Sequence, residues 1–128
     1  MHLNVLKSKI HRAKVTQTEL AYMGSVSIDP WLMEAAGMNE YEKILVVNLE
    51  SGVRFETYCI KGEPGQGTVC VNGAAARLAI KGDKIIIMSF CLVTPQELEY
   101  HRPKIVFVDE NNAVTTIEEL ERHGQRKE

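Results

Sequence analysis

Apolar and polar residues alternate along much of the chain, and this period of two is typical of β-strands with one buried face. Alternation or a short β-branched run occurs within residues 5–10, 21–29, 43–49, 53–60, 68–71, 84–94 and 104–108. Residues 50–52 supply the turn of a hairpin between the segments 43–49 and 53–60. Six to eight strands at this spacing, with little helix between them, predict a mainly β fold that closes as a compact barrel.

Shorter segments carry helix signals instead. In "DPWLMEAAGM", Asp29 as N-cap, Pro30 at the first helical position and Gly37 as the stop predict a short helix. A second short helix is expected after Asn72-Gly73, and one helical turn within residues 95–100. The charged segment 115–128 is expected to be a flexible tail with some helical character.

Composition and charge narrow the function classes. The chain has 128 residues, 45% apolar and 25% charged, which predicts one soluble domain over residues 1–128. A formal net charge of −2 argues against bulk nucleic-acid binding and against a polybasic membrane tether. No stretch approaches the ~20 apolar residues of a membrane span, and the N-terminus lacks a signal-peptide pattern, so we expect a cytoplasmic protein.

The cysteines and histidines show no metal-ligand spacing, so no metal site is predicted. Cys59, Cys70 and Cys91 each lie in an apolar, strand-like context. They are interpreted as small buried hydrophobic residues in a reducing compartment. A catalytic cysteine is the alternative, but no histidine lies near any of them in the sequence.

A basic cluster lies near the N-terminus and contains Lys7, Lys9, His11, Arg12 and Lys14. On a regular strand, the first three share one face and the last two share the other. The cluster is either a solvated strand edge, where lysines discourage aggregation, or an anion site that holds a carboxylate.

The pair Gly24-Ser25 stands inside a β-rich run, "AYMGSVSID". Gly24 marks a bend or special backbone geometry, and Ser25 is either a nucleophile or one half of a reactive peptide bond. Farther along, "GVRFETY" places Arg54 and Tyr58 on one side of a strand and Thr57 on the other. The small residues of "NGAAA" let the backbone approach another strand or a small ligand closely.

Four separated motifs, "KSKIHR", "YMGSVSID", "RFETY" and "VNGAAA", occur in the order and spacing of bacterial aspartate 1-decarboxylases. The chain resembles this family from about residue 1 to residue 108, and "RPKIVFVD" fits the family's late strand. The resemblance implies a double-psi β-barrel, a homotetramer with active sites between neighbouring subunits, L-aspartate as substrate, and a place in pantothenate biosynthesis. It implies neither a nucleic-acid partner nor a membrane.

The resemblance also implies a cofactor made from the chain. The bond between Gly24 and Ser25 breaks autocatalytically, which leaves a small chain of residues 1–24 and a larger chain of residues 25–128. Ser25 becomes a pyruvoyl group that forms a Schiff base with the substrate amine. The carbonyl of the pyruvoyl group replaces pyridoxal phosphate as the electron sink, and the sequence shows no phosphate-binding loop for that cofactor.

Roles for the remaining motif residues follow from the same resemblance. Tyr58 is the proton donor; substrate binding involves Arg54, Thr57, Lys9, His11, Gly73, Ala74 and Ala75; processing involves Gly24, Ser25, Thr57, Tyr22 and Asn72. Val47 and Arg77 depart from the family: some members have tryptophan at the position of Val47, and many have histidine at the position of Arg77. The sequence does not show whether cleavage is spontaneous or requires a maturation protein.

Two other interpretations remain at this point. A non-catalytic barrel would use the basic N-terminal segment to bind nucleic acid or a protein partner. A hydrolase would use Ser25 as an ordinary nucleophile, but no convincing base and acid partners accompany it.

Overall fold

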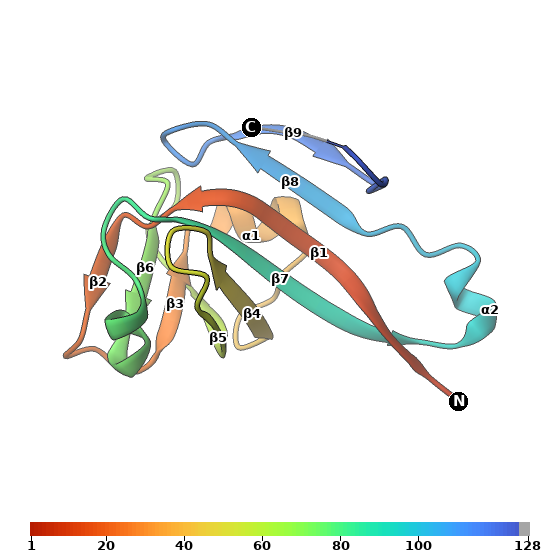
Figure 1. The fold of residues 1–128 in the computed structure, drawn as a ribbon, viewed down its shortest axis with the longest axis horizontal. Coiled ribbons are helices and arrows are strands. Elements are labelled where there is room, and N and C mark those ends of the chain that lie inside the picture. The colour runs from red at the N-terminus through yellow and green to blue at the C-terminus, as the bar shows by residue number, and fades with distance from the viewer. Residues whose placement is uncertain (126–128) are drawn as a thin grey trace.

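Residues 1–125 are described by the structure, a computed structural model, and they form nine strands and three short helices (Figure 1). In chain order these are β1 (Leu3–Lys14), β2 (Gln17–Glu19), β3 (Ser25–Ile28), α1 (Pro30–Ala36), β4 (Lys43–Asn48), β5 (Arg54–Lys61), β6 (Val69–Asn72), η1 (Gly73–Leu78), β7 (Lys84–Val93), α2 (Pro95–Leu98), β8 (Lys104–Val108) and β9 (Val114–Glu118). The predicted mainly β fold with a few short helices is confirmed. The short strands β2 and β9 bring the number of strands above the six to eight expected.

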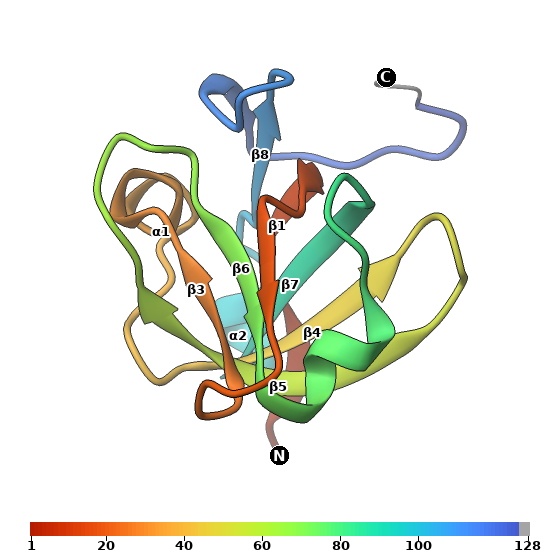
Figure 2. The same cartoon turned by 90° about the vertical axis from the view of Figure 1, so that its left-hand side faces the viewer.

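All nine strands of residues 1–125 join one sheet in the order β2-β6-β3-β5-β4-β7-β1-β8-β9. The sheet curls, and Figure 2 shows β6, β3, β5, β4 and β7 wrapped around a common interior. Just after β1, the backbone N–H of Thr16 donates to the Val69 carbonyl of β6 at 2.9 Å and links the C-terminal end of β1 to β6. The double-psi topology stays a prediction.

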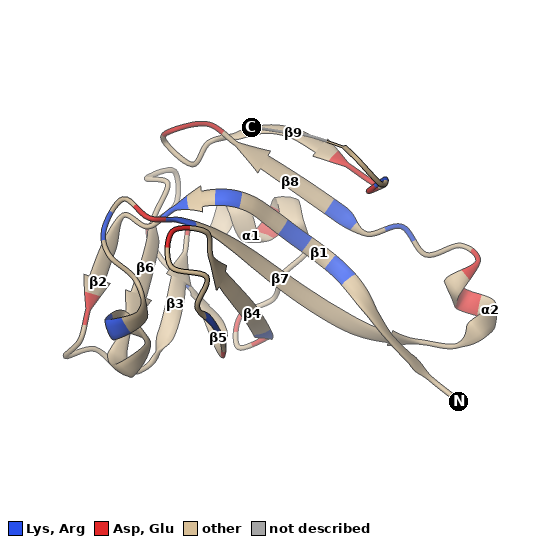
Figure 3. Ribbon diagram, in the orientation of Figure 1, with Lys and Arg blue, Asp and Glu red and all other residues tan. Residues whose placement is uncertain are grey.

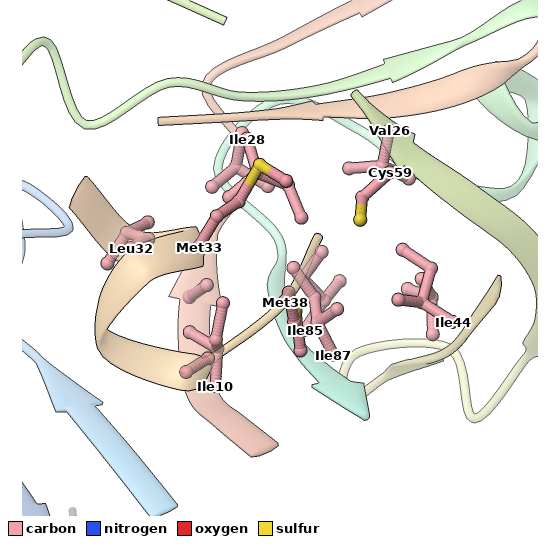
Figure 4. Close-up of a cluster of buried hydrophobic side chains, with 14 of the residues drawn as sticks. Ile10, Val26, Ile28, Leu32, Met33, Met38, Ile44, Cys59, Ile85 and Ile87 are labelled. Atoms are coloured by element: carbon pink, nitrogen blue, oxygen red, sulfur yellow. The ribbon is translucent and has the colours of Figure 1, made fainter. Parts of the chain in front are cut away.

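The interior is filled by branched aliphatic side chains from most strands and from α1 (Figure 4). Its largest fully buried members include Ile10, Ile28, Leu32, Met33, Ile44, Ile85 and Ile87. Burying one such side chain stabilises the fold by roughly 1.5–3 kcal/mol, so this core fixes the strands that carry the site.

The helix α1 begins and ends where its local signals predict. The Asp29 carboxylate accepts from the backbone N–H of Trp31 at 2.9 Å, and Gly37 ends the helix at φ 69°. The second carboxylate oxygen of Asp29 accepts from the backbone N–H of Gly67 at 2.8 Å and ties the 62–67 loop to the helix. The predicted turn at residues 95–100 is also confirmed as α2.

The face assignment for the basic cluster is wrong at its C-terminal end. A register shift between Ile10 and Ala13 interrupts β1, with Arg12 at φ 62°. Ile10, Ala13 and Val15 are all buried, so the buried positions change from even to odd numbers across the bulge. Lys14 therefore lies on the same outward side as Lys9, not on the opposite one.

The helical character expected for the tail is also wrong in part. Residues Val114–Glu118 form β9 and pair antiparallel with β8. Its first four residues are exposed and Glu118 is half-buried, while its backbone is paired with β8. The flexibility of residues 115–128 stays a prediction, and residues 126–128 lie outside the described range. No helix within residues 1–125 has the length and apolar character needed to cross a membrane.

Candidate active site

Ser25 is the first residue of β3, and β3 lies between β6 and β5 in the sheet. Its antiparallel neighbour on β6 is Asn72. The parallel register with β5 pairs Val26 with Cys59, which puts Ser25 beside Tyr58. Side chains at neighbouring positions of adjacent strands point to the same side of a sheet, so Asn72, Ser25 and Tyr58 share one face across three strands.

Ser25 is only 1% exposed, and its hydroxyl group forms hydrogen bonds within the protein. The Asn72 side-chain nitrogen donates to Ser25 Oγ at 3.1 Å and to Ser27 Oγ at 2.9 Å. Ser25 Oγ can donate in turn to the Met23 carbonyl at 3.4 Å. In this arrangement Ser25 Oγ accepts a hydrogen bond from Asn72, and the hydroxyl hydrogen of Ser25 points toward Met23 instead.

Gly73 makes the closest backbone approach in the site. It follows Asn72 at φ 66°, and a Cβ added to it would lie 2.6 Å from Gly24 Cα and 2.8 Å from Gly24 N. Only glycine fits this contact. Gly24 itself is different: it has no left-handed φ, and a Cβ there would meet nothing within 4 Å. The bend predicted at Gly24 is confirmed, whereas the left-handed backbone conformation of the site is at Gly73, which packs against Gly24.

Tyr58, Thr57 and Arg54 lie on β5 as predicted, with Tyr58 and Arg54 exposed and Thr57 half-buried on alternate faces. The Tyr58 ring lies 6.4 Å from the Tyr41 ring, centroid to centroid. Tyr41 has φ 73°, a strained conformation for a non-glycine residue, so its ring is kept beside Tyr58 at an energetic cost.

Tyr22 is 58% exposed in the turn before Gly24, and Ala74 and Ala75 open η1 directly after Gly73. The Tyr22 carbonyl lies 3.2 Å from the position that a Gly73 Cβ would take. Of these predicted residues, Gly73 and the Tyr22 carbonyl meet at Gly24, and the two alanines follow Gly73 directly in the chain. Ala75 also packs against the hydrophobic core.

Lys9 and His11 are not brought to this group within one chain. They lie on β1 opposite Ile105 and Phe107 of β8, where the His11 and Phe107 rings meet edge to face at 5.6 Å. This part of β1 is separated from the start of β3 in both views (Figures 1 and 2). Lys9 Nζ instead lies 2.7 Å from the Glu121 carboxylate, beside a hollow of about 250 Å³.

The lysines of the basic cluster are paired with carboxylates. Lys7 binds Glu42 at 2.9 Å, and Lys14 lies 3.6 Å from Glu110. Burial alone would raise the pKa of Glu42, but hydrogen bonds from Lys7 and from Asn39 outweigh it and hold that pKa below its usual range. The lysines of β1 (blue in Figure 3) pair with carboxylates that come from other segments of the chain, so binding to nucleic acid through this strand is not favoured.

Cys70 is a site residue that sequence reasoning missed. It is buried, as predicted, but its Sγ lies 3.1 Å from Asn72 Oδ1. The signal was the register of "SVSI" against "VCVN", because Ser25 and Ser27 face Asn72 and Cys70 in antiparallel pairing. Cys59 is also buried as predicted, whereas Cys91 is partly exposed, so the predicted burial is wrong for Cys91.

The two departures from the family lie at the edge of the site. Val47 is the partner of Arg54 across β4 and β5, so a smaller side chain adjoins the guanidinium there. Arg77 is exposed in the last turn of η1. Within residues 1–125, no group of three histidine, cysteine, aspartate or glutamate side chains is arranged to hold a metal ion.

Comparison with known proteins agrees with this geometry. The family model described as aspartate decarboxylase matches residues 1–115. The protein named aspartate 1-decarboxylase from Clostridium acetobutylicum is 56% identical over 97% of the chain and 98% of its own length. The protein of the same name from Caldicellulosiruptor saccharolyticus is 58% identical over 98% of the chain and 98% of its own length. The protein of that name from Campylobacter jejuni is 55% identical over 97% of the chain and 98% of its own length. The chain belongs to the aspartate decarboxylase family.

Proposed function

We propose that the chain is an aspartate 1-decarboxylase that converts L-aspartate to β-alanine and CO₂ with a pyruvoyl group made from Ser25. The observation that carries the proposal is the arrangement around the Gly24-Ser25 bond. A buried serine hydroxyl is held by Asn72, and Gly73 packs on the backbone of Gly24. The relatives named aspartate 1-decarboxylase support the same substrate.

The residues around Ser25 fit a carbonyl group formed at that position. Because Gly73 has no Cβ, its backbone can lie directly against Gly24. The side-chain N–H of Asn72 donates a hydrogen bond to Ser25 Oγ. Polarised oxygen atoms need such donors in a buried site, because water is not there to provide them. No pyridoxal phosphate and no metal ion are needed for this assignment.

The group would form from the chain alone. Ser25 Oγ attacks the Gly24 carbonyl carbon and loses its proton, and the Gly24-Ser25 C–N bond breaks as the nitrogen gains a proton, which leaves an ester. Loss of the Ser25 Cα proton then breaks the Cβ–Oγ bond, so residue 24 leaves as a carboxylate and residue 25 becomes dehydroalanine. Addition of water and loss of ammonia give the carbonyl. Asn72 donates to the attacking oxygen, and Gly73 lets Gly24 approach it.

A carbonyl at residue 25 supplies an electron sink for the charge left on the substrate when CO₂ departs. Tyr58 lies beside Ser25 on β5 and would donate its phenol proton to the substrate Cα. The exposed Arg54 guanidinium matches a carboxylate in shape and charge and would hold the substrate. Thr57, on the other face of the strand, serves processing together with Tyr22.

The placement of Lys9 and His11 away from Ser25 supports a shared site. We infer that a neighbouring subunit brings its β1 to this group, so that active sites form between subunits of a homotetramer. Arg54 and Tyr58 are exposed in the single chain, as residues that await a substrate or a neighbour would be. The double-psi topology, the cytoplasmic location and the role in supplying β-alanine for pantothenate belong to the same proposal.

The test is turnover of L-aspartate by the purified full-length protein with no pyridoxal phosphate and no metal ion added. We expect stoichiometric β-alanine and CO₂, loss of both products in Ser25→Ala, and loss of most activity in Tyr58→Phe with the fold unchanged. Undiminished turnover by Ser25→Ala would refute the proposal. Incubation with host lysate shows whether a maturation protein is required.

A further inference from the structure

Asn72 has both hydrogens of its side-chain amide committed, one to Ser25 Oγ and one to Ser27 Oγ, at 3.1 and 2.9 Å. It is 1% exposed, so no water competes for them. An amide can rotate by half a turn and exchange its oxygen and nitrogen with little change of shape. Something on the oxygen side must therefore decide which end faces Ser25.

Cys70 lies on that side. Its Sγ is 3.1 Å from Asn72 Oδ1, two residues before Asn72 on β6 and opposite Ser27 on β3. Burial raises the pKa of the Cys70 thiol, and the Glu19 carboxylate raises it further, so the thiol keeps its hydrogen at neutral pH. A protonated thiol donates to a carbonyl oxygen, whereas it is a poor acceptor for an amide N–H.

We propose that Cys70 is a positioning residue for self-cleavage, whose thiol donates to Asn72 Oδ1 and so turns the amide nitrogen toward Ser25 Oγ. The proposal rests on the self-cleavage proposed above and adds a residue to it. Ser25 and Ser27 alternate along β3, and Cys70 and Asn72 alternate along β6. The antiparallel register of the two strands brings all four side chains to one face of the sheet.

The orientation matters when Ser25 Oγ attacks. As the hydroxyl loses its proton, negative charge grows on Oγ. An amide N–H pointing at Oγ stabilises that charge, and an amide oxygen in the same place repels it. With the nitrogen toward Ser25, the hydroxyl hydrogen is also free to point elsewhere, as it does toward the Met23 carbonyl. In the rotated amide, Asn72 Oδ1 would capture that hydrogen.

Two matched pairs of variants separate hydrogen bonding from packing. Cys70→Thr and Cys70→Val have nearly the same shape, but only threonine can donate. Cys70→Ser and Cys70→Ala make the same comparison with smaller side chains. Freshly made full-length protein is followed by intact mass spectrometry, and the half-time of the cut between residues 24 and 25 is measured. Circular dichroism and thermal melts report whether each variant is folded.

We expect the valine and alanine variants to cleave about fivefold more slowly than their threonine and serine counterparts, as loss of one net hydrogen bond predicts. Melting temperatures should be similar within each pair. Cys91→Ala, at a partly exposed position on β7, should cleave at the wild-type rate.

Equal half-times within each folded pair would overturn the role of Cys70 while leaving the decarboxylase proposal standing. If one pair fails to fold, the other pair decides. If the wild-type protein is never cut, alone or with host lysate, then the self-cleavage and the role of Cys70 both fail.

Discussion

Replacing Gly73 with alanine is the sharpest perturbation that the structure offers. The new Cβ would lie 2.6 Å from Gly24 Cα, and both Gly24 contacts are backbone atoms that cannot swing aside. Carbon atoms pack at about 3.5 Å, so the Gly24 backbone must move by about 1 Å. Alanine at φ 66° adds a left-handed strain of about 1–2 kcal/mol.

A displacement of this size at a reacting bond lowers rates by about a hundredfold. We therefore expect Gly73→Ala to fold with reduced stability and to cleave between residues 24 and 25 about a hundred times more slowly than wild type. The assay is a time course by intact mass spectrometry, with thermal unfolding of the same samples.

Gly52→Ala is the matched control. Gly52 has φ 77°, but a Cβ there would meet nothing within 4 Å. Gly52→Ala should lose stability through the same left-handed strain, without the steric clash, and should still cleave at the wild-type rate. Cleavage of Gly73→Ala within threefold of Gly52→Ala would show that contact with Gly24 does not govern processing.

Three further predictions concern charge and strain. Glu121→Gln frees Lys9 from a pair at 2.7 Å, and we expect the KM for aspartate to fall about twofold at low salt and to be unchanged at high salt. Lys7→Met removes the partner that lowers the pKa of Glu42, and urea unfolding should show a loss of about 1 kcal/mol at pH 7. Because this depressed pKa stabilises the fold above the usual value of 4.5, the difference should disappear as the pH falls below it; a constant difference at pH 3 would contradict the reasoning. Tyr41→Gly should raise the free energy of unfolding by about 1 kcal/mol by relieving φ 73°, yet lower kcat because the ring beside Tyr58, the proposed proton donor, is lost.

Local signals made α1 and the β4–β5 hairpin predictable. The cap at Asp29, the proline after it and Gly37 act within a few residues, so no tertiary information is needed. The tail was misjudged for the opposite reason. β9 is a strand because β8 offers it an edge to pair with, and the side chains of β9 carry no information about that pairing. The bulge at Arg12 likewise depends on how β1 pairs with β7.

The site was predictable as a set of residues but not as an arrangement. The motifs identify Ser25, Asn72 and Tyr58, and the structure places them on three adjacent strands. The contact of Cys70 with Asn72, on which its proposed role rests, could not be seen along the chain, because it depends on the register of β3 against β6. The separation of Lys9 from Ser25 is also a property of the folded chain, and it supports the proposal that subunits share the site.

The most direct test of the central proposal is the mass of the purified protein under denaturing conditions. We predict two species: a chain of residues 1–24 that ends at Gly24, and a chain of residues 25–128 whose blocked first residue has the mass of a pyruvoyl group. Ser25→Ala should remain one chain. A wild-type protein that stays uncut after incubation with host lysate, and yet produces β-alanine from aspartate, would contradict the proposal.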